Sequence, residues 1–378
     1  MFSIAEMFGH FAEFDWRMIV MWIIGGTLIF LAIKKEMEPT LLLPMGFGAI
    51  MVNLPISGAV NQFVDGILAS EGPLSTLYEM GISNELFPLI LFIGIGAMID
   101  FGPILSNPKL MIFGAAAQFG IFFTLCLASR FFPANDAASI AIIGAADGPT
   151  AIVVAQKLQS QYLGAIMVAA YSYMALVPII QPPIIKGLTT KKERMIRMPY
   201  RPKSVSKTTR ILFPIVITAV AGLVAPSSVA LIGFLMFGNL MRECGVLDSL
   251  SETAQKVLAN LITIFLGITI ASQMQAEQFL KAETLLIMGL GLFAFIFDTA
   301  GGVIFAKILN LFLKTKINPM IGAAGISAFP MAGRIVHKLG LEEDPQNHLL
   351  MQSIGVNVSG QIASVIAGGV ILNIFQNM

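Results

Sequence analysis

Long uncharged runs alternate with short charged stretches along the whole chain. A transmembrane helix needs about 20 mainly apolar residues, and several runs close to that length or longer contain no Asp, Glu, Lys or Arg. These runs are residues 18–33, 39–64, 86–99, 110–129, 158–185, 211–241, 257–276 and 345–378. A further run, 284–313, is interrupted only by Asp298 and Lys307. The pattern predicts an all-α integral membrane protein with about ten transmembrane helices. The 211–241 run is expected to form two helices around a turn at residues 226–228, because Pro and Ser punctuate helices.

The composition agrees with a membrane protein. Hydrophobic residues make up 56% of the 378, and charged residues only 12%. A soluble domain carries about 25% charged residues, so this chain has too few to cover a water-soluble particle of its size. The two cysteines argue against a disulfide framework. The sequence has no nucleic-acid-binding signature, and we expect a lipid membrane, not nucleic acid, as its surroundings.

The distribution of charge predicts how the chain is oriented. Lys and Arg accumulate in cytoplasmic loops, and residues 186–210 hold nine basic residues and one acidic residue. The 57–85 segment holds four acidic residues and no basic one, and it is expected outside. Alternation of the spans between these two segments then places both termini outside and 186–210 in the cytoplasm.

One segment does not fit this alternation as a complete span. Residues 135–157 must enter and leave on the outer side if 186–210 is cytoplasmic, which predicts a re-entrant hairpin. Its two halves around Asp147 are about 10 residues each, too short to cross a bilayer. The alternative is one kinked helix that spans the membrane, but this would reverse the side of the basic segment.

Two parts of the chain resemble each other. Ile-Gly-Ala-Ala occurs at 143–146 and at 321–324, and 94–114 resembles 267–289. The copies start on opposite sides of the predicted membrane, which is typical of secondary transporters with inverted repeats and broken helices. The predicted organisation is a scaffold at 1–84, repeat one at 85–185, the basic segment at 186–210, linking helices at 211–255, and repeat two at 256–378. A second re-entrant hairpin is expected at 317–335, open to the cytoplasm.

Asp147 is the first candidate site residue. An ionisable group at the centre of a membrane helix costs at least about 2.5–3.5 kcal/mol. It lies between Gly144 and Gly148, where glycine and Pro149 interrupt the helix, and broken backbone can coordinate a small cation. A carboxylate with the Thr150 hydroxyl could hold sodium or a proton. The alternative is a structural Asp that caps a helix N-terminus.

Other polar groups in the apolar runs also have two readings. Arg334, at the end of the second hairpin, could bind a carboxylate or mark the membrane boundary. Asp298 could be a ligand in a broken helix or face an aqueous cavity. A buried tyrosine such as Tyr171 or Tyr173 usually makes a structural hydrogen bond, although a phenol can relay a proton. The neutral oxygen ligands, each of which could instead hold helices together, are Asn318, Ser327, Asn357 and Ser359.

Seven longer motifs carry a family resemblance. They are GIGAMIDFGP (94–103), GAAAQFGIF (114–122), IIGAADGPTAI (142–152), AAYSYMALVPIIQPPI (169–184), FGNLMRECGV (237–246), INPMIGAAGISAFPMAGR (317–334) and DPQNHLLMQ (344–352). Together they resemble the beta subunit of the sodium-translocating biotin-dependent decarboxylases over nearly the whole chain.

The resemblance implies an activity. Such a subunit decarboxylates carboxybiotin delivered by a biotin-carrier partner, consumes a proton from outside and exports sodium ions across the bacterial inner membrane. It implies an elevator-like fold, a homotrimer of beta subunits, and as further partners a carboxyltransferase alpha subunit and a single-helix gamma or delta subunit. The only metal implied is sodium. The implied sodium and proton residues are Asp147, Tyr173, Asn318, Gly322, Ser327, Arg334 and Asn357.

Some points stay open at the level of sequence. Either Tyr173 or Asp147 could donate the proton. The 57–85 segment is short beside that of oxaloacetate-type members, which favours an acyl-CoA decarboxylase complex. A sodium-coupled carboxylate transporter without chemistry, or a structural anchor, would also have apolar spans, but the long motifs favour the decarboxylase.

Overall fold

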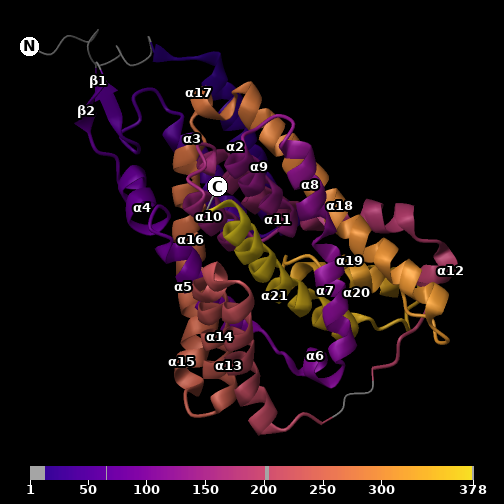
Figure 1. Cartoon of the computed structure of the whole chain (residues 1–378). Helices are drawn as coiled ribbons and strands as arrows, with labels where there is room; N and C mark the ends of the chain where they lie inside the picture. The colour runs from indigo at the N-terminus through magenta and orange to yellow at the C-terminus, as the bar shows by residue number, and fades with distance from the viewer. Residues whose placement is uncertain (1–12, 65, 201–203, 377–378) are drawn as a thin grey trace, which may run out of the picture.

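The protein is described here by a computed structural model, which covers residues 13–64, 66–200 and 204–376. It is mostly helical (Figure 1). Within these described ranges, seven helices are long and apolar enough to cross a membrane, and an eighth span is obtained if α4 and α5, which are bent by 65°, count as one. The chain is therefore a multi-pass membrane protein. The two termini, Met1 and Met378, which are expected to face the outside of the cell, are not among the described residues, and neither is part of the basic segment (201–203).

The N-terminal part contains an element that the apolar runs do not predict. After α2 (Trp16–Lys35) and α3 (Pro39–Val52), the strands β1 (Gln62–Val64) and β2 (Ile67–Ser70) pair antiparallel. The purely helical prediction is therefore corrected by one small hairpin, in which Gly66 takes a positive φ of 78° that suits glycine in a tight turn. The helices α4 (Pro73–Gly81) and α5 (Leu86–Met98) follow.

The middle of the chain contains the first broken element. Its helices are α6 (Gly102–Ser106), η2 (Pro108–Leu110), α7 (Met111–Ala117), α8 (Phe119–Ala128), α9 (Ala134–Ala141), η3 (Ile142–Ala145), α10 (Gly148–Lys157), α11 (Leu163–Leu188) and α12 (Lys191–Arg194). The predicted hairpin at 135–157 coincides with α9, η3 and α10, which are interrupted at residues 146–147. The predicted basic loop is partly helical, because α11 extends to Leu188 and Thr190 forms a capping box with Glu193 at the start of α12.

The C-terminal half begins with the predicted pair of linking helices. They are α13 (Lys207–Val224) and α14 (Val229–Cys244), joined by η4 (Pro226–Ser228), so the predicted turn is confirmed. Then follow α15 (Asp248–Thr253), the π-helix η5 (Ala254–Leu258), α16 (Ala259–Ile270), η6 (Ala271–Gln273), α17 (Ala276–Phe279), α18 (Ala282–Phe312), α19 (Met320–Ala323), α20 (Met331–Glu343) and α21 (Leu350–Phe375).

One order of elements occurs twice. A span, a short helix, a second span, a broken helix pair and a third span appear as α5, α6, α7–α8, α9–α10 and α11. The same order appears as α16, α17, α18, α19–α20 and α21. The second broken pair differs from its prediction, since α20 continues to Glu343, past residue 335. Arg334 therefore lies in the first turn of α20, not at the end of the hairpin.

The spans differ in how far the rest of the protein covers them. In α21 and α11, 67% and 61% of the most apolar stretch is buried, against 22% in α2 and 11% in α13. Figure 1 accordingly shows α21 (yellow) running through the middle of the molecule and α13 at its edge. Polar residues on α11 and α21 are thus surrounded by protein, where they can form a site.

Candidate functional site

Asp147 lies where the first broken helix changes direction. The 3-10 helix η3 ends at Ala145, its C-cap Ala146 has a left-handed φ of 53°, and Asp147 is the N-cap of α10. Its side chain accepts a hydrogen bond from the Thr150 backbone N–H, as expected for a cap. Asp147 is only 3% exposed. The capping geometry is present, but it accounts for only one of the hydrogen bonds to this carboxylate.

The two carboxylate oxygens of Asp147 differ in their environment. Oδ2 accepts three hydrogen bonds, from the Thr150 hydroxyl (2.8 Å), the Ser364 hydroxyl (2.9 Å) and the Gln361 amide (3.1 Å). Among the described residues, Oδ1 accepts only from the Thr150 N–H, at 3.3 Å. An ionised carboxylate has about four lone-pair sites, so Oδ2 is fully used while Oδ1 retains capacity for a cation.

The tips of the two broken helices meet beside Asp147. The Ser327 N–H donates to the Ala145 carbonyl oxygen at 3.0 Å. The Ser327 hydroxyl donates to the Ser364 hydroxyl, which in turn donates to Asp147. The Asn357 amide donates to the Ile326 carbonyl oxygen at 2.7 Å, and its buried Oδ1 has no partner among the described residues. Of the predicted residues, Thr150 bonds Asp147 directly, Ser327 is joined to it through Ser364, and Asn357 bonds the residue before Ser327.

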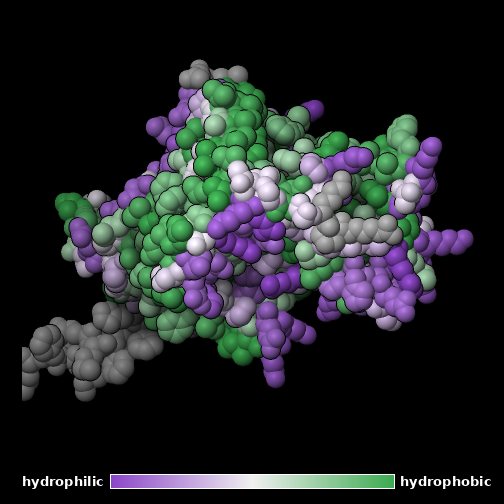
Figure 2. Space-filling view, turned by 90° about the horizontal axis from the view of Figure 1, so that it is seen from below, coloured by the Kyte–Doolittle hydropathy of each residue, from purple (hydrophilic) through white to green (hydrophobic). Residues whose placement is uncertain are grey.

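A cavity of about 260 Å³ opens beside Asp147. Arg334 lines it, and the Arg334 guanidinium makes no hydrogen bond or ion pair with another described residue. Glu38, Gln255 and Asn260 line it from α3, η5 and α16. Figure 2 views the molecule from the end at which α13, α14 and α15 lie in Figure 1, and hydrophilic side chains gather around a recess near the middle of that face. The cavity can therefore hold an anion near Arg334 and a cation near Asp147.

The two tyrosines of α11 face different surroundings. Residues two positions apart on a helix point roughly 200° apart, so only one can face Asp147. Tyr171 lines the cavity, its ring lies against Gly148, and its buried hydroxyl has no partner in the described part of the chain. Tyr173 points the other way and donates to the Met288 carbonyl oxygen. The predicted catalytic residue Tyr173 is therefore not next to Asp147, whereas Tyr171 is.

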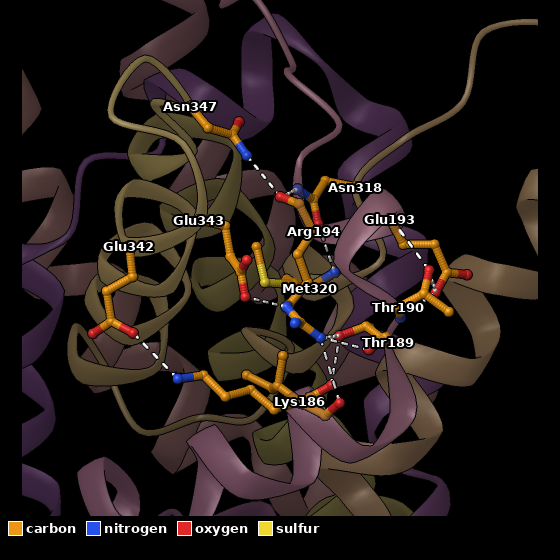
Figure 3. A network of polar contacts seen from close by, with 11 residues as sticks. Lys186, Thr189, Thr190, Glu193, Arg194, Asn318, Met320, Glu342, Glu343 and Asn347 are labelled. Atoms are coloured by element: carbon orange, nitrogen blue, oxygen red, sulfur yellow. Dashed lines mark hydrogen bonds and ion pairs between the residues drawn. The ribbon is translucent and has the colours of Figure 1, made fainter.

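Asn318 belongs to a different network (Figure 3). Its amide donates to the carbonyl oxygens of Arg194 (2.8 Å) and Ile196 (2.9 Å), and the Asn347 amide also donates to the Arg194 carbonyl. Asn318 is not among the residues that line the cavity. It therefore joins the second broken helix to the segment after α12 and is not brought to Asp147.

Ion pairs strengthen this connection. We use the term clasp for residues 186–197 together with residues 342–347, to which they are bound. Arg194 Nε donates to Glu343 Oε1 at 2.6 Å, with both side chains about 15% exposed. Arg197 donates to both carboxylate oxygens of Asp344. These hydrogen bonds hold the pKa of Asp344 below its ordinary value. The contribution of this pair to stability is therefore present at neutral pH, and it is lost as the pH falls through the lowered pKa.

Asp298 takes neither of the roles expected for it. The helix α18 is continuous through this position, and Asp298 is fully buried. Its Oδ1 accepts from the N–H groups of Gly120 and Ile121, the first turn of α8. Asp298 thus caps α8 from another helix and is neither a break in α18 nor exposed to a cavity. Its Oδ2 has no partner among the described residues.

Close packing surrounds four further residues of the predicted site, Gly144, Gly148, Gly322 and Ser359. A Cβ added at Gly148 would lie 2.4 Å from the Tyr171 ring, and one at Gly322 would lie 2.0 Å from the Gly302 carbonyl oxygen. At Gly144 a Cβ would lie 2.8 Å from Asp298 Oδ2. Ser359 donates to carbonyl oxygens of Leu110 and Val356, so it packs α21 against η2 and α7.

Sequence reasoning missed two residues that contact Asp147 directly. Gln361 and Ser364 lie on α21, four and seven residues after Asn357. Positions i, i+4 and i+7 share one face of a helix, and three polar residues at this spacing in an uncharged span were the available signal. Glu38 and Asn260 were also missed, because no pattern in the sequence relates them to Asp147.

Apolar spans and a buried carboxylate where two broken helices meet are features of an ion-transporting membrane protein. Residues 17–375 match the family described as the Na⁺-transporting oxaloacetate decarboxylase beta subunit. The chain belongs to this family, and it is the beta subunit of a sodium-pumping decarboxylase.

Several relatives are similar over almost their whole length. The methylmalonyl-CoA decarboxylase subunit beta of Propionigenium modestum is 48% identical, with 94% of each chain covered. That of Veillonella parvula is also 48% identical, with 97% of this chain and 95% of the relative covered. The oxaloacetate decarboxylase beta chain of Klebsiella pneumoniae is 44% identical, with 93% and 94% covered.

Proposed function

We propose that this subunit decarboxylates carboxybiotin on a biotin-carrier partner and uses the reaction to export sodium, with Asp147 as the ion-binding carboxylate. The observation that carries the proposal is the position of Asp147. It is buried where two broken helices meet, and one of its oxygens has free acceptor capacity. It shares a cavity with Arg334, whose guanidinium has no ion-pair partner within the described part of the chain.

We also propose the orientation and the repeats. The ten spans would be α2, α3, α5, α7–α8, α11, α13, α14, α15–α16, α18 and α21, with re-entrant hairpins at 134–157 and 318–343. The repeated order of elements from α5 and from α16 supports an inverted repeat with elevator-like movement. The basic segment 186–210 would face the cytoplasm of a bacterial cell and both termini the outside. Glu38, which lines the cavity four residues after Lys34, would then lie toward the cytoplasmic side.

In this mechanism, sodium binds at Asp147 Oδ1, with oxygen atoms of Thr150, Ser327 and Asn357 nearby. The carboxylate of carboxybiotin binds Arg334, whose guanidinium is free to pair with it. The bond between the biotin nitrogen and the carboxyl carbon breaks, its electron pair stays on nitrogen, and carbon dioxide leaves. The nitrogen then takes up one proton, which restores neutral biotin.

The proton provides the coupling. A proton that arrives from the outside at Asp147 removes the negative charge that holds sodium, and the ion leaves outward. Asp147 can then pass the proton to the biotin nitrogen, and general acids of this kind contribute about 10²–10⁴-fold to rate. Tyr171, whose hydroxyl is unpaired beside Asp147, is better placed for this transfer than Tyr173.

The proposed complex contains other subunits. We expect a biotin carrier, a carboxyltransferase alpha subunit and a single-helix gamma or delta subunit, around a trimer of beta subunits. A carboxylated acyl-CoA is favoured as the substrate that the complex decarboxylates. The methylmalonyl-CoA relatives align over 374 and 368 positions, whereas the Klebsiella oxaloacetate relative needs 407 positions for a chain of 378 residues, which means additional segments in that relative.

The test is decarboxylation of free carboxybiotin by the purified complex, with and without sodium. Asp147→Asn should abolish the stimulation by sodium. Asp136→Asn is the matched control, because Asp136 is also buried and also belongs to the first hairpin, but it binds Ser160 and Gln161. Full sodium-dependent turnover in Asp147→Asn would refute the proposal, as would equal losses in the two variants.

A further inference from the structure

The cavity next to Asp147 has a second polar wall. One wall carries Asp147 and Arg334, from α10 and α20. The lining of the cavity also includes Glu38, just before α3, and Asn260, on α16, and these two helices pack against each other. Asn260 is exposed, and its amide makes no hydrogen bond with another described residue. Both a donor and an acceptor on this wall are therefore available to a bound molecule.

Glu38 is held in an unusual way. It is the N-cap of α3, but its backbone is left-handed (φ 35°, ψ 57°) and its carboxylate makes no capping hydrogen bond. A bulky residue at positive φ is uncommon and costs free energy, and an acid at this position normally accepts from the first turn of its helix. Arg334 is the charge that acts on Glu38, yet the two do not form an ion pair within 4 Å. Space remains between the two charged groups.

The ring of carboxybiotin has groups that match both walls. Its N1′-carboxylate is an anion, its N3′–H is a donor and its ureido carbonyl is an acceptor. A carboxylate such as Glu38 accepts from an N–H, and the amide of Asn260 donates to a carbonyl oxygen. The sulfur-containing ring is apolar and suits the apolar lining of the cavity, which includes Leu41, Leu91, Met98, Phe329 and Pro330.

We propose that Glu38 and Asn260 form the subsite for the ureido ring of biotin, with Glu38 accepting from N3′–H and Asn260 donating to the ureido oxygen, in the same cavity as Arg334. This proposal rests on the decarboxylation of carboxybiotin proposed above. In it, Arg334 holds the group that leaves, and Glu38 and Asn260 hold the ring that remains. The subsite therefore binds biotin before and after the loss of carbon dioxide.

Binding of the product can be measured apart from the reaction. Free biotin and biotin methylated at N3′, which lacks the donor to Glu38, are added as inhibitors of carboxybiotin decarboxylation by the purified complex. In the wild type the methylated compound should inhibit about tenfold less well, because a hydrogen bond to a charged group is lost. In Glu38→Ala both compounds should inhibit equally. Asn260→Ala should weaken inhibition by both compounds and raise KM for carboxybiotin, with kcat and the half-saturating sodium concentration unchanged.

Thr263→Val is the control, since Thr263 lines the same wall but its hydroxyl is bonded to the Ala259 carbonyl of its own helix. It should keep the wild-type difference between the two inhibitors. The proposal is overturned if Glu38→Ala retains that difference, or if Asn260→Ala changes the sodium dependence and leaves KM unaltered. Failure of the decarboxylation itself would appear separately, as a wild-type complex without sodium-stimulated turnover.

Discussion

Ser364→Ala tests the role of α21 in holding the ion-binding carboxylate. The Ser364 hydroxyl donates to Asp147 Oδ2 at 2.9 Å and accepts from the Ser327 hydroxyl. The substitution removes one hydrogen bond to a charged group, which contributes about 1.5–3 kcal/mol. Thr150 and Gln361 still donate to Oδ2, so we expect the lower end of this range.

A loss of about 1.4 kcal/mol corresponds to a tenfold change in an equilibrium constant. Because sodium is expected at Oδ1, a less firmly held carboxylate should bind it less well, and the half-saturating sodium concentration for carboxybiotin decarboxylation should rise about tenfold. Ser353→Ala is the matched control, since Ser353 is also buried on α21 but donates only to the Leu349 carbonyl. An unchanged sodium requirement in Ser364→Ala, or an equal rise in Ser353→Ala, would refute this reasoning.

Three further substitutions test the surroundings of the site. Gly148→Ala places a methyl group 2.4 Å from the Tyr171 ring, and such overpacking should cost about 1–3 kcal/mol; a thermal unfolding midpoint equal to the wild type would contradict this. Asp298→Asn keeps one acceptor for the first turn of α8 but replaces the second, buried oxygen by an NH₂ group that must find an acceptor, so it should lower thermal stability without changing the half-saturating sodium concentration. A change in that concentration would instead place Asp298 in the ion site. Arg194→Gln breaks the ion pair with Glu343 and should cost about 1.5–3 kcal/mol, seen as faster amide hydrogen exchange in 318–347; unchanged exchange would mean that the clasp does not hold this segment.

The membrane character and most long helices could be predicted from the sequence. A charge in an apolar run is costly, so the uncharged runs mark segments that lipid or protein covers. The turn at Pro226 was predictable because proline has no N–H to continue a helix. The β1–β2 hairpin was not, since the uncharged run 39–64 continues through β1 and hides the change from a helix to a strand.

The site was predictable where the signal is local and not where it depends on distant segments. Asp147 stands out because glycine and proline flank a charge in an apolar run. Gln361 lies 214 residues away, and only the packing of α21 against α10 makes it a partner. The role of Asp298 was missed for a similar reason: its partners are N–H groups of another helix, and these leave no mark in the sequence.

The choice between Tyr171 and Tyr173 shows a further limit. Both lie in one apolar helix, and which of the two faces Asp147 depends on how α11 is rotated against its neighbours. An amphipathic pattern normally fixes that rotation, but α11 is buried on several sides. The family resemblance selected Tyr173, whereas the packing places Tyr171 at the cavity.

The hydrogen bond from the Ser327 N–H to the Ala145 carbonyl joins the two broken helices through backbone atoms alone. Mutation of a side chain does not remove such a bond, and proline, which has no N–H, is the single residue type at 327 that would. The contact between the two broken helices therefore tolerates most substitutions at these two positions. Substitution of the side chains around it can therefore change which ion is bound, or how tightly, while the backbone bond between the two broken helices is kept.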